Sequence, residues 1–265
     1  MDLDSVQMAL IALVGVIAGT INTLVGGGTL LVLPLLIFLG IDPLVANGTN
    51  RVCVALQAAV AGWTMSRDRG SAKAPAGEAT VDPVSVGGWP FLLVFIAAIP
   101  GAWGAIEIDT LDQSLFKQLM GGVLLLAVAA FLLLKTPGEG QGSRKRISGL
   151  SFSIGCLLCG LYGGFMGAGI GAFVILLLTT ALRLPLVDAV RWKVWLVMVI
   201  SAAAGGWYLA HGVFSVAIAV PLIPSYALGG MLGGRIVLRS GNRFLKPLVA
   251  VLSAVLALAI LAGWG

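Results

Sequence analysis

Long apolar runs follow one another along almost the whole sequence, separated by short stretches that are polar or rich in glycine and proline. An apolar run of about 18 residues or more is long enough for a helix that crosses the hydrocarbon core of a bilayer. The runs of this length are Val6–Val25, Leu44–Met65, Val86–Ile106, Leu115–Leu134, Ile147–Met166, Leu186–Ala210, Val213–Ile236 and Phe244–Ala262. The pattern predicts an all-α fold, a polytopic transmembrane helical bundle.

The charge content agrees with a membrane location. The chain is 59% hydrophobic and 10% charged, whereas a soluble domain carries about 25% charged residues. The net charge of +5 comes from basic residues in short loops, so nucleic acid is not an expected partner. The first residues hold Asp2 and Asp4 and no basic residue, unlike a secretory signal, so we expect this segment to be retained.

The sequence has two similar halves. Gly26-Gly27-Gly28-Thr29 ends the first apolar run, and Gly167-Ala168-Gly169-Ile170-Gly171 ends the fifth. The apolar pieces that follow, Leu30–Leu39 and Ala172–Leu182, are too short to cross a bilayer of about 30 Å. Further matches occur in the same order: Pro43-Leu44-Val45 with Pro185-Leu186-Val187, Gly62-Trp63 with Gly206-Trp207, and Gly101 and Gly104 with Gly230 and Gly233. These matches predict two transmembrane repeats, 1–135 and 147–265, joined by a basic cytoplasmic linker, 136–146.

Basic residues, which favour cytoplasmic loops, predict how the repeats sit in the membrane. They gather in three loops: Arg67, Arg69 and Lys73; Lys135, Arg144, Lys145 and Arg146; and Arg235, Arg239 and Arg243. Each repeat then consists of a glycine-broken helix pair that begins and ends on one side, followed by three full spans. Three crossings reverse the side, so the second repeat is inverted and the N-terminus is outside. Inverted repeats with broken helices are a recurring design of secondary transporters. The pattern leaves open whether each pair re-enters or crosses twice.

The two glycine-rich breaks are the first candidate site. Non-helical backbone inside a membrane is tolerated only against protein or a watery cavity, so we expect both breaks to face the interior. The amides at the following helix starts suit an anion, and close packing by small residues is the alternative explanation. The candidate residues of the breaks are Asn22, Gly26, Gly27, Gly28, Thr29, Gly167, Gly169 and Gly171.

Charged and polar residues inside the spans form the second candidate site. Thr49, Asn50 and Arg51 follow the start of one span, and Arg191 and Lys193 occupy similar depths in another. Intramembrane charge is costly and usually faces the protein interior. The inversion brings Arg51 and Lys193 toward the midplane from opposite sides, where the two would flank one anion. Snorkelling toward the interface is the alternative.

The three cysteines, Cys53, Cys156 and Cys159, lie in apolar surroundings. Cys156 and Cys159 have Cys-x-x-Cys spacing, but no nearby histidine or carboxylate completes a metal set. We expect them to be core residues, and we expect no metal and no cofactor.

Three sequence blocks together resemble the sulfite exporter TauE/SafE family. They are Gly19–Gly28, Leu33–Leu36 and Ala46–Arg51. Gly160–Gly171, with Leu184, Pro185 and Ala189 after it, is similar to the second repeat of that family. The resemblance covers essentially the whole chain.

The resemblance implies export or permeation of small anions, such as sulfite, sulfoacetate or related organosulfonates, across a bacterial or archaeal inner membrane. The chain departs from the family at Arg191-Trp192-Lys193, where the second repeat is usually smaller and less charged.

We therefore predict a secondary transporter, an exporter or permease of a small anion, sulfite or an organosulfonate, that works by alternating access. Its expected partners are the anion and the lipid bilayer; proton coupling and a homo-oligomer stay open. One alternative is a membrane-embedded thiol enzyme that uses Cys156 and Cys159. The other is a membrane scaffold that transports nothing.

Overall fold

The computed structural model describes residues 3–67, 88–111, 149–182 and 184–263, with the backbone alone for 240–263. Regular structure in these ranges is helical throughout, as predicted. The helices are α1 (Ser5–Leu24), α2 (Thr29–Phe38), α3 (Pro43–Arg67), α4 (Trp89–Leu111), α6 (Gly149–Phe165), α7 (Ile170–Ala181), α8 (Leu186–Ala210) and α9 (Val216–Gly263). The predicted span Leu115–Leu134 and the linker 136–146 lie outside the described residues.

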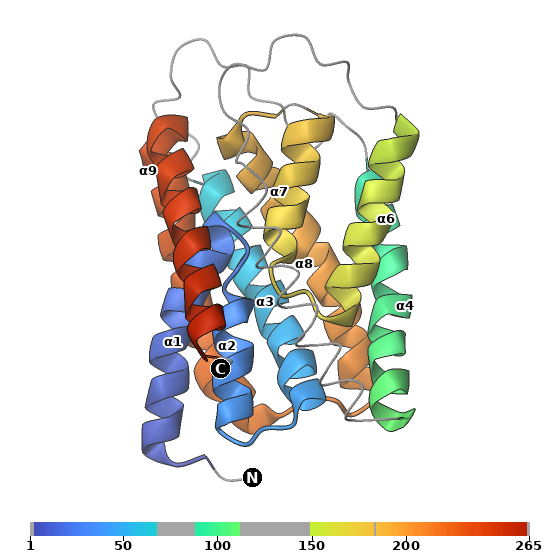
Figure 1. Ribbon diagram of the computed structural model, residues 1–265, viewed down its shortest axis with the longest axis vertical. Coiled ribbons are helices and arrows are strands. Elements are labelled where there is room, and N and C mark those ends of the chain that lie inside the picture. Colours follow the sequence, from blue (N-terminus) through green and yellow to red (C-terminus); the bar gives the residue numbers. More distant parts are fainter. Residues whose placement is uncertain (1–2, 68–87, 112–148, 183, 264–265) are drawn as a thin grey trace.

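Three stretches of the described chain are long and apolar enough to cross a membrane: α1, Trp89–Thr110 of α4 and Val216–Arg239 of α9. Helices α3 and α8 have 25 residues each, a length of about 37 Å, but they carry polar and charged residues. Both lie in the middle of the bundle, between the α1–α9 pair and the α4–α6 pair (Figure 1). The polar residues Asn50, Arg51 and Lys193 of these two helices are therefore buried inside the bundle.

The two glycine-broken pairs point in opposite directions. Figure 1 shows α1 starting at the end of the bundle that holds the N-terminus and α2 returning to that same end. Helix α6 starts at the opposite end and α7 returns there. In both pairs the second helix thus returns to the end at which the first began, and their opposite directions agree with the predicted inversion, while the repeat boundaries 1–135 and 147–265 stay a prediction.

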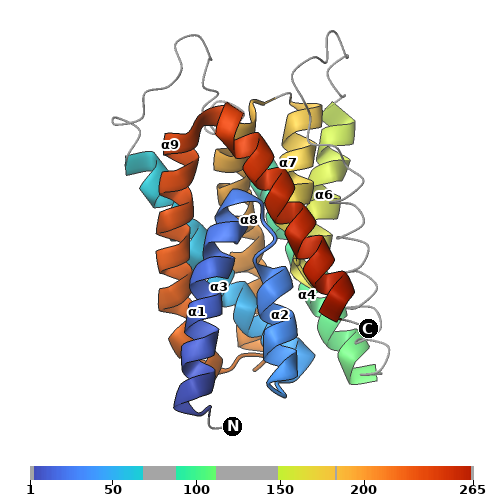
Figure 2. The same ribbon diagram turned by 60° about the vertical axis from the view of Figure 1, so that its left-hand side comes forward.

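The last helix combines two predicted spans. Helix α9 runs over 48 residues, Val216–Gly263, where the sequence predicts Val213–Ile236 and Phe244–Ala262 as separate spans. Figure 2 shows that the helix reverses direction near its middle and returns beside the bundle. The helical content is as expected, and the chain turns back without leaving helical hydrogen bonding.

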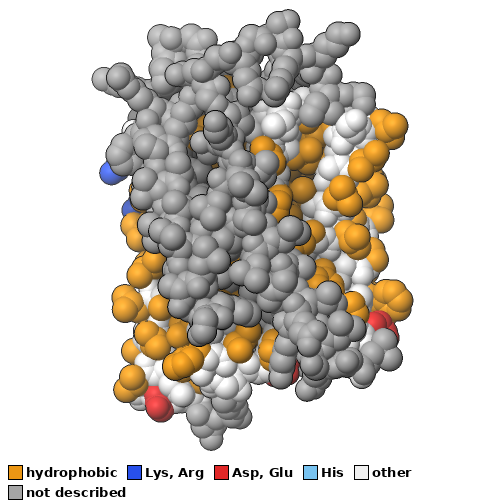
Figure 3. All heavy atoms as spheres, viewed as in Figure 1, with side chains coloured by type: hydrophobic (Ala, Val, Ile, Leu, Met, Phe, Trp, Pro, Cys, Tyr) orange, Lys and Arg blue, Asp and Glu red, His pale blue; other side chains and the backbone are white. Residues whose placement is uncertain are grey.

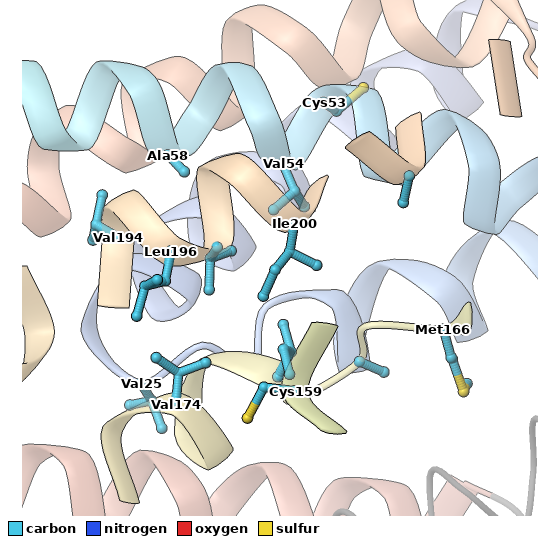
Figure 4. Close-up of a cluster of buried hydrophobic side chains, with 14 of the residues drawn as sticks. Val25, Cys53, Val54, Ala58, Cys159, Met166, Val174, Val194, Leu196 and Ile200 are labelled. Atoms are coloured by element: carbon cyan, nitrogen blue, oxygen red, sulfur yellow. The ribbon is translucent and has the colours of Figure 1, made fainter. Parts of the chain in front are cut away.

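Close contacts between helices join the first half of the chain to the second, for example in the α4–α6 and α1–α9 pairs. A Cβ on Gly101 of α4 would overlap the carbonyl of Leu161 in α6, and a Cβ on Gly229 of α9 would overlap the carbonyl of Val16 in α1. Small residues at helix interfaces allow such approach in membranes, where burial of apolar surface gives little driving force. Side chains of α3 and α8, such as Val54 and Ile200, fill the core between these pairs (Figure 4).

Gly101→Ala is expected to destabilise the protein by about 2 kcal/mol, because overpacking a tight interface typically costs 1–3 kcal/mol. Gly104 lies on the same helix, and none of the described residues comes within 4 Å of its added Cβ, so Gly104→Ala is the matched control. Thermal unfolding in detergent compares the two variants. Equal melting temperatures would show that α4 and α6 are not packed as described.

Candidate functional site

The two breaks meet in the interior of the bundle. Gly26 has φ +93°, Gly167 has φ +63° and Gly169 has φ +73°, in the left-handed region that glycine adopts without steric cost. A Cβ on Gly26 would overlap the Cα of Gly171, so the first break touches the start of α7 backbone to backbone. Both interpretations made from the sequence therefore apply. The glycines interrupt the helices, and they also permit close packing.

Arg51 of α3 reaches across to the second break. Its side chain is fully buried. Nη1 donates to the Gly163 carbonyl at 3.5 Å and to the Ser201 hydroxyl at 3.4 Å, and Nη2 donates to the Thr29 hydroxyl at 3.3 Å. A Cβ on Gly167 would overlap the guanidinium. The missing side chain at Gly167 thus makes the space that Arg51 occupies.

Lys193 of α8 reaches across to the first break. The residue is 1% exposed. Its Nζ donates to the carbonyl of Asn22 at 2.8 Å and to the carbonyl of Thr23 at 2.6 Å. Both carbonyls belong to the last turn of α1, where helix carbonyls lack intrahelical partners. Lys193 therefore caps the broken end of α1.

The two cations occupy equivalent positions in the repeats. Arg51 follows Pro43 at the same interval at which Lys193 follows Pro185. Their carbonyl acceptors correspond as well, because Asn22 precedes Gly26 as Gly163 precedes Gly167. Each half of the chain thus supplies a cation to the broken helix of the other half. The matching intervals are visible in the sequence. The sequence does not show that each cation donates to carbonyls in the other half of the chain.

Amide side chains fix the first break. Asn22 Nδ2 donates to Gln57 Oε1 at 2.7 Å, and Gln57 Nε2 donates to the Thr23 hydroxyl at 2.6 Å. Gln57 was not among the predicted site residues. Its spacing from Asn50 could have indicated that it belongs to the site, because the two residues are two turns apart on α3 and share a face.

Thr29, at the start of α2, is a shared acceptor in the centre of the site. Its hydroxyl accepts from Asn50 Nδ2 at 3.2 Å in addition to Arg51. Tyr226 of α9 donates its hydroxyl to Asn50 Oδ1 at 2.8 Å. Tyr226 was also missed, since a lone tyrosine in an apolar run gives no signal of its partner.

The end of α6 is capped from α3 and α8. Tyr208 donates its hydroxyl to the carbonyls of Gly164 and Phe165, both at 3.0 Å, and Asn47 Nδ2 donates to Phe165 at 2.9 Å. Tyr162 donates its hydroxyl to the Ala168 carbonyl inside the break. The second break is therefore held in place by side chains rather than by regular helix.

Two predicted site residues have partners away from the breaks. The Thr49 hydroxyl accepts from the Ser215 amide at 2.9 Å, just before α9. Arg191 pairs with Asp188 at 3.5 Å in the first turn of α8, and its side chain is 14% exposed. Successive residues of a helix face different sides, so these two side chains do not share the face of Arg51 and Lys193.

The centre of the site carries net positive charge. In the described part of the chain, neither Arg51 nor Lys193 forms an ion pair with a carboxylate. The C-terminal ends of α1 and α6 each carry roughly −0.5 charge, and the N-terminal ends of α2 and α7 each carry roughly +0.5, so these four ends nearly cancel. The guanidinium of Arg51 keeps its charge in proteins, and a buried charge without a counterion is unfavourable. This arrangement favours an anion.

A cavity of about 200 Å³ opens near the N-terminal end of the bundle. It is lined by Leu3, Ile41, Asp42, Val45, Ser215, Ala217 and Ile218. Val45 lies one helical turn before Thr49, and the Ser215 amide donates to the Thr49 hydroxyl, so Thr49 lies next to two of the lining residues. Asn50 and Arg51 follow Thr49 in the chain and are fully buried, so the site is closed on this side.

The candidate thiols lie in the hydrophobic core. Cys156 and Cys159 are both buried on α6, and Figure 4 shows Cys159 among the core side chains. Within the described ranges, no group of three or more histidine, cysteine, aspartate or glutamate residues is placed to hold a metal ion.

A helical bundle with two oppositely directed broken helix pairs and a buried polar centre is typical of a membrane transporter. The model of the family described as sulfite exporter TauE/SafE matches residues 11–260. The chain belongs to this family, as the sequence resemblance indicated.

Three relatives have similar lengths. A "probable membrane transporter protein" of Haemophilus influenzae is 28% identical over 96% of this chain and 94% of its own. The "probable membrane transporter protein YfcA" of Escherichia coli is 25% identical over 94% and 87%. The "probable membrane transporter protein ORF9" of a Sinorhizobium species is 25% identical over 98% and 95%. No solved structure gives a significant match.

Proposed function

We propose that the protein is a secondary transporter of a small oxyanion, sulfite or an organosulfonate, and that it works by alternating access. The observation that carries this proposal is the pair of buried cations, Arg51 and Lys193, at the point where the two breaks meet. An anion bound there would neutralise charge that no carboxylate of the described residues pairs with. The family description names sulfite, which supports the cargo class.

Arg51 is the principal anion ligand in this proposal. Its Nη bonds are 3.3–3.5 Å long, and its buried Nε has no acceptor among the described residues. Two adjacent N–H groups of a guanidinium match two oxygens of a sulfite or sulfonate group. Thr29 and Asn50, together with the amides of Gly27, Gly28, Gly169 and Gly171, would add hydrogen-bond donors around the same point.

The proposed orientation puts the N-terminal end outside a bacterial or archaeal cytoplasmic membrane. In Figure 3, basic side chains on the visible face lie toward the end opposite the N-terminus and acidic ones lie at the N-terminal end. Arg67, exposed at the end of α3, agrees with that distribution and with the preference of basic residues for the cytoplasm. The cavity lined by Val45 and Ser215 would then face outward, and movement of one repeat against the other would open it to Arg51.

Flux into proteoliposomes tests the proposal. Purified protein is reconstituted, and uptake of ³⁵S-labelled sulfite and sulfoacetate is followed with sulfate and chloride as competitors and with or without a pH gradient. We expect saturable uptake of a sulfur oxyanion above empty vesicles, and a pH gradient that changes the rate would assign proton coupling. Uptake equal to empty vesicles for every anion would favour the scaffold alternative, which also predicts a tightly co-purifying partner.

The double variant Cys156→Ser/Cys159→Ser is expected to keep its flux, because both thiols are buried in the hydrophobic core. We expect a slightly lower melting temperature, because the variant places two hydroxyls where two thiols were buried. Flux per folded protein is the measurement. Loss of activity in this variant together with full activity in Arg51→Ala would instead support the thiol enzyme.

A further inference from the structure

The carbonyl oxygens around the Lys193 ammonium group are arranged as they would be around a bound monovalent cation. Its ammonium group lies between the carbonyl oxygens of Asn22 and Thr23, at 2.8 and 2.6 Å, and the residue is 1% exposed. An ammonium has three donors and no acceptor, and here no carboxylate of the described residues is its partner. In transporters with broken helices, unwound carbonyls at half-helix C-terminal ends are the groups that coordinate monovalent cations.

We propose that Lys193 fills, with its own ammonium group, a monovalent-cation site formed by the carbonyl oxygens of Asn22 and Thr23, so that the wild-type protein needs no dissolved sodium ion there. The part of this inference that concerns coupling rests on the proposed transport function. The cation site itself does not, because it is defined by binding alone.

The carbonyls of this site are fixed before any ion arrives. Gln57 holds the side chains of both residues, accepting from Asn22 and donating to Thr23. The Thr23 hydroxyl also donates to the Gly19 carbonyl at 2.9 Å. The broken end of α1 adds roughly −0.5 charge, which favours a cation at this point. A fixed pair of oxygens at a negative helix end is a site even when the lysine is removed.

The aliphatic part of the Lys193 side chain reaches the first break by passing the start of α7. The stem crosses the start of α7, where a Cβ on Gly171 would lie 3.2 Å from Lys193 Cδ. Gly171 also touches Gly26, so the stem passes directly beside the junction of the two breaks. Truncating the side chain would leave a space that leads to the two carbonyls and is wide enough for a small ion.

The contrast with Arg51 separates the roles of the two equivalent residues. Lys193 makes two short bonds to carbonyls, whereas Arg51 makes three bonds of 3.3–3.5 Å, two of them to hydroxyls. The Arg51 Nε has no acceptor in the described chain. Lys193 is therefore the tethered counter-cation of the first break, and Arg51 remains available to a substrate anion.

Lys193→Ala tests the site through stability. Wild type and variant are melted in detergent in sodium, potassium, choline or n-propylammonium chloride at one ionic strength. We expect wild-type melting temperature to be the same in all four. We expect the variant to be destabilised in choline and raised by roughly 5 °C or more, saturably, by sodium, potassium or propylammonium.

Lys193→Met is the matched control, because its uncharged stem fills the space that the alanine variant opens. It should stay destabilised in every salt. A Lys193→Ala variant that melts alike in all four salts, or that aggregates in all of them, overturns the proposal. A Lys193→Met variant as stable as wild type also overturns it, because the cation would then be dispensable.

A flux measurement separates this inference from the proposed function. Wild-type anion uptake should be equal in sodium and choline, and uptake by Lys193→Ala should be stimulated by sodium. Cation rescue of stability without anion uptake in the wild type would remove the transport proposal and keep the site. Sodium-dependent uptake by the wild type would keep transport and remove the tethered-cation inference.

Discussion

Replacing Arg51 with alanine is expected to lower anion flux about 30-fold or more, because removing one partner of a buried charge pair costs 2–5 kcal/mol. Arg51 is fully buried at the contact between the breaks, and a bound oxyanion would be its only charged partner among the described groups. The same change should abolish the rise in melting temperature that sulfite or sulfoacetate gives the wild type. Flux into proteoliposomes and melting in detergent measure the two effects.

Two variants separate the role of charge from that of geometry. Arg67→Ala removes an arginine from the exposed end of the same helix and should leave flux unchanged. Arg51→Lys keeps the charge and loses the fork that binds two oxygens, so it should retain weak binding of the anion. Flux in Arg51→Ala equal to that of Arg67→Ala would exclude Arg51 from the transport site.

Gly167→Ala is the second change with a large expected effect. A Cβ there would overlap the Arg51 guanidinium, so Arg51 would have to leave its acceptors. The left-handed backbone at φ +63° adds a cost of about 1–2 kcal/mol for a residue with a side chain. We expect flux to fall nearly as far as in Arg51→Ala, although the variant keeps every charged group.

Gly212→Ala isolates the backbone contribution. Gly212 has φ +74° in the turn between α8 and α9, and no atom of the described residues lies within 4 Å of an added Cβ. It should therefore lose stability as Gly167→Ala does and keep its flux. Equal flux in the two variants would mean that the position of the guanidinium beside the second break has no part in transport.

Glycine and charge patterns allowed much of this architecture to be predicted. Gly26–Gly28 and Gly167–Gly171 mark both helix breaks, because a glycine cluster inside an apolar run is a local signal for interrupted helix. Arg51 and Lys193 stand out because charge inside a span is rare. The expectation that both lie at the centre agrees with their burial, while their role in binding an anion stays a proposal.

Other parts of the candidate site could not be predicted because they depend on which helices become neighbours. Tyr208 contacts the end of α6, and Tyr226 contacts Asn50 within α3, both from distant points of the chain. Thr49 and Arg191 looked equivalent to their neighbours, yet they bind Ser215 and Asp188. A difference of one or two positions on a helix changes the facing side by 100–200°, and only packing decides which side is the interior.

By itself, the sequence determined the membrane class, the two breaks and the presence of cations within the spans, because each follows from local composition and spacing. Tertiary structure alone decided that each cation closes the broken helix of the other repeat. That exchange depends on the backbone contact between Gly26 and Gly171, which brings together segments more than a hundred residues apart. The interval from the proline to the cation can be read in each half of the sequence. The carbonyl that accepts from each cation, however, lies in the other half.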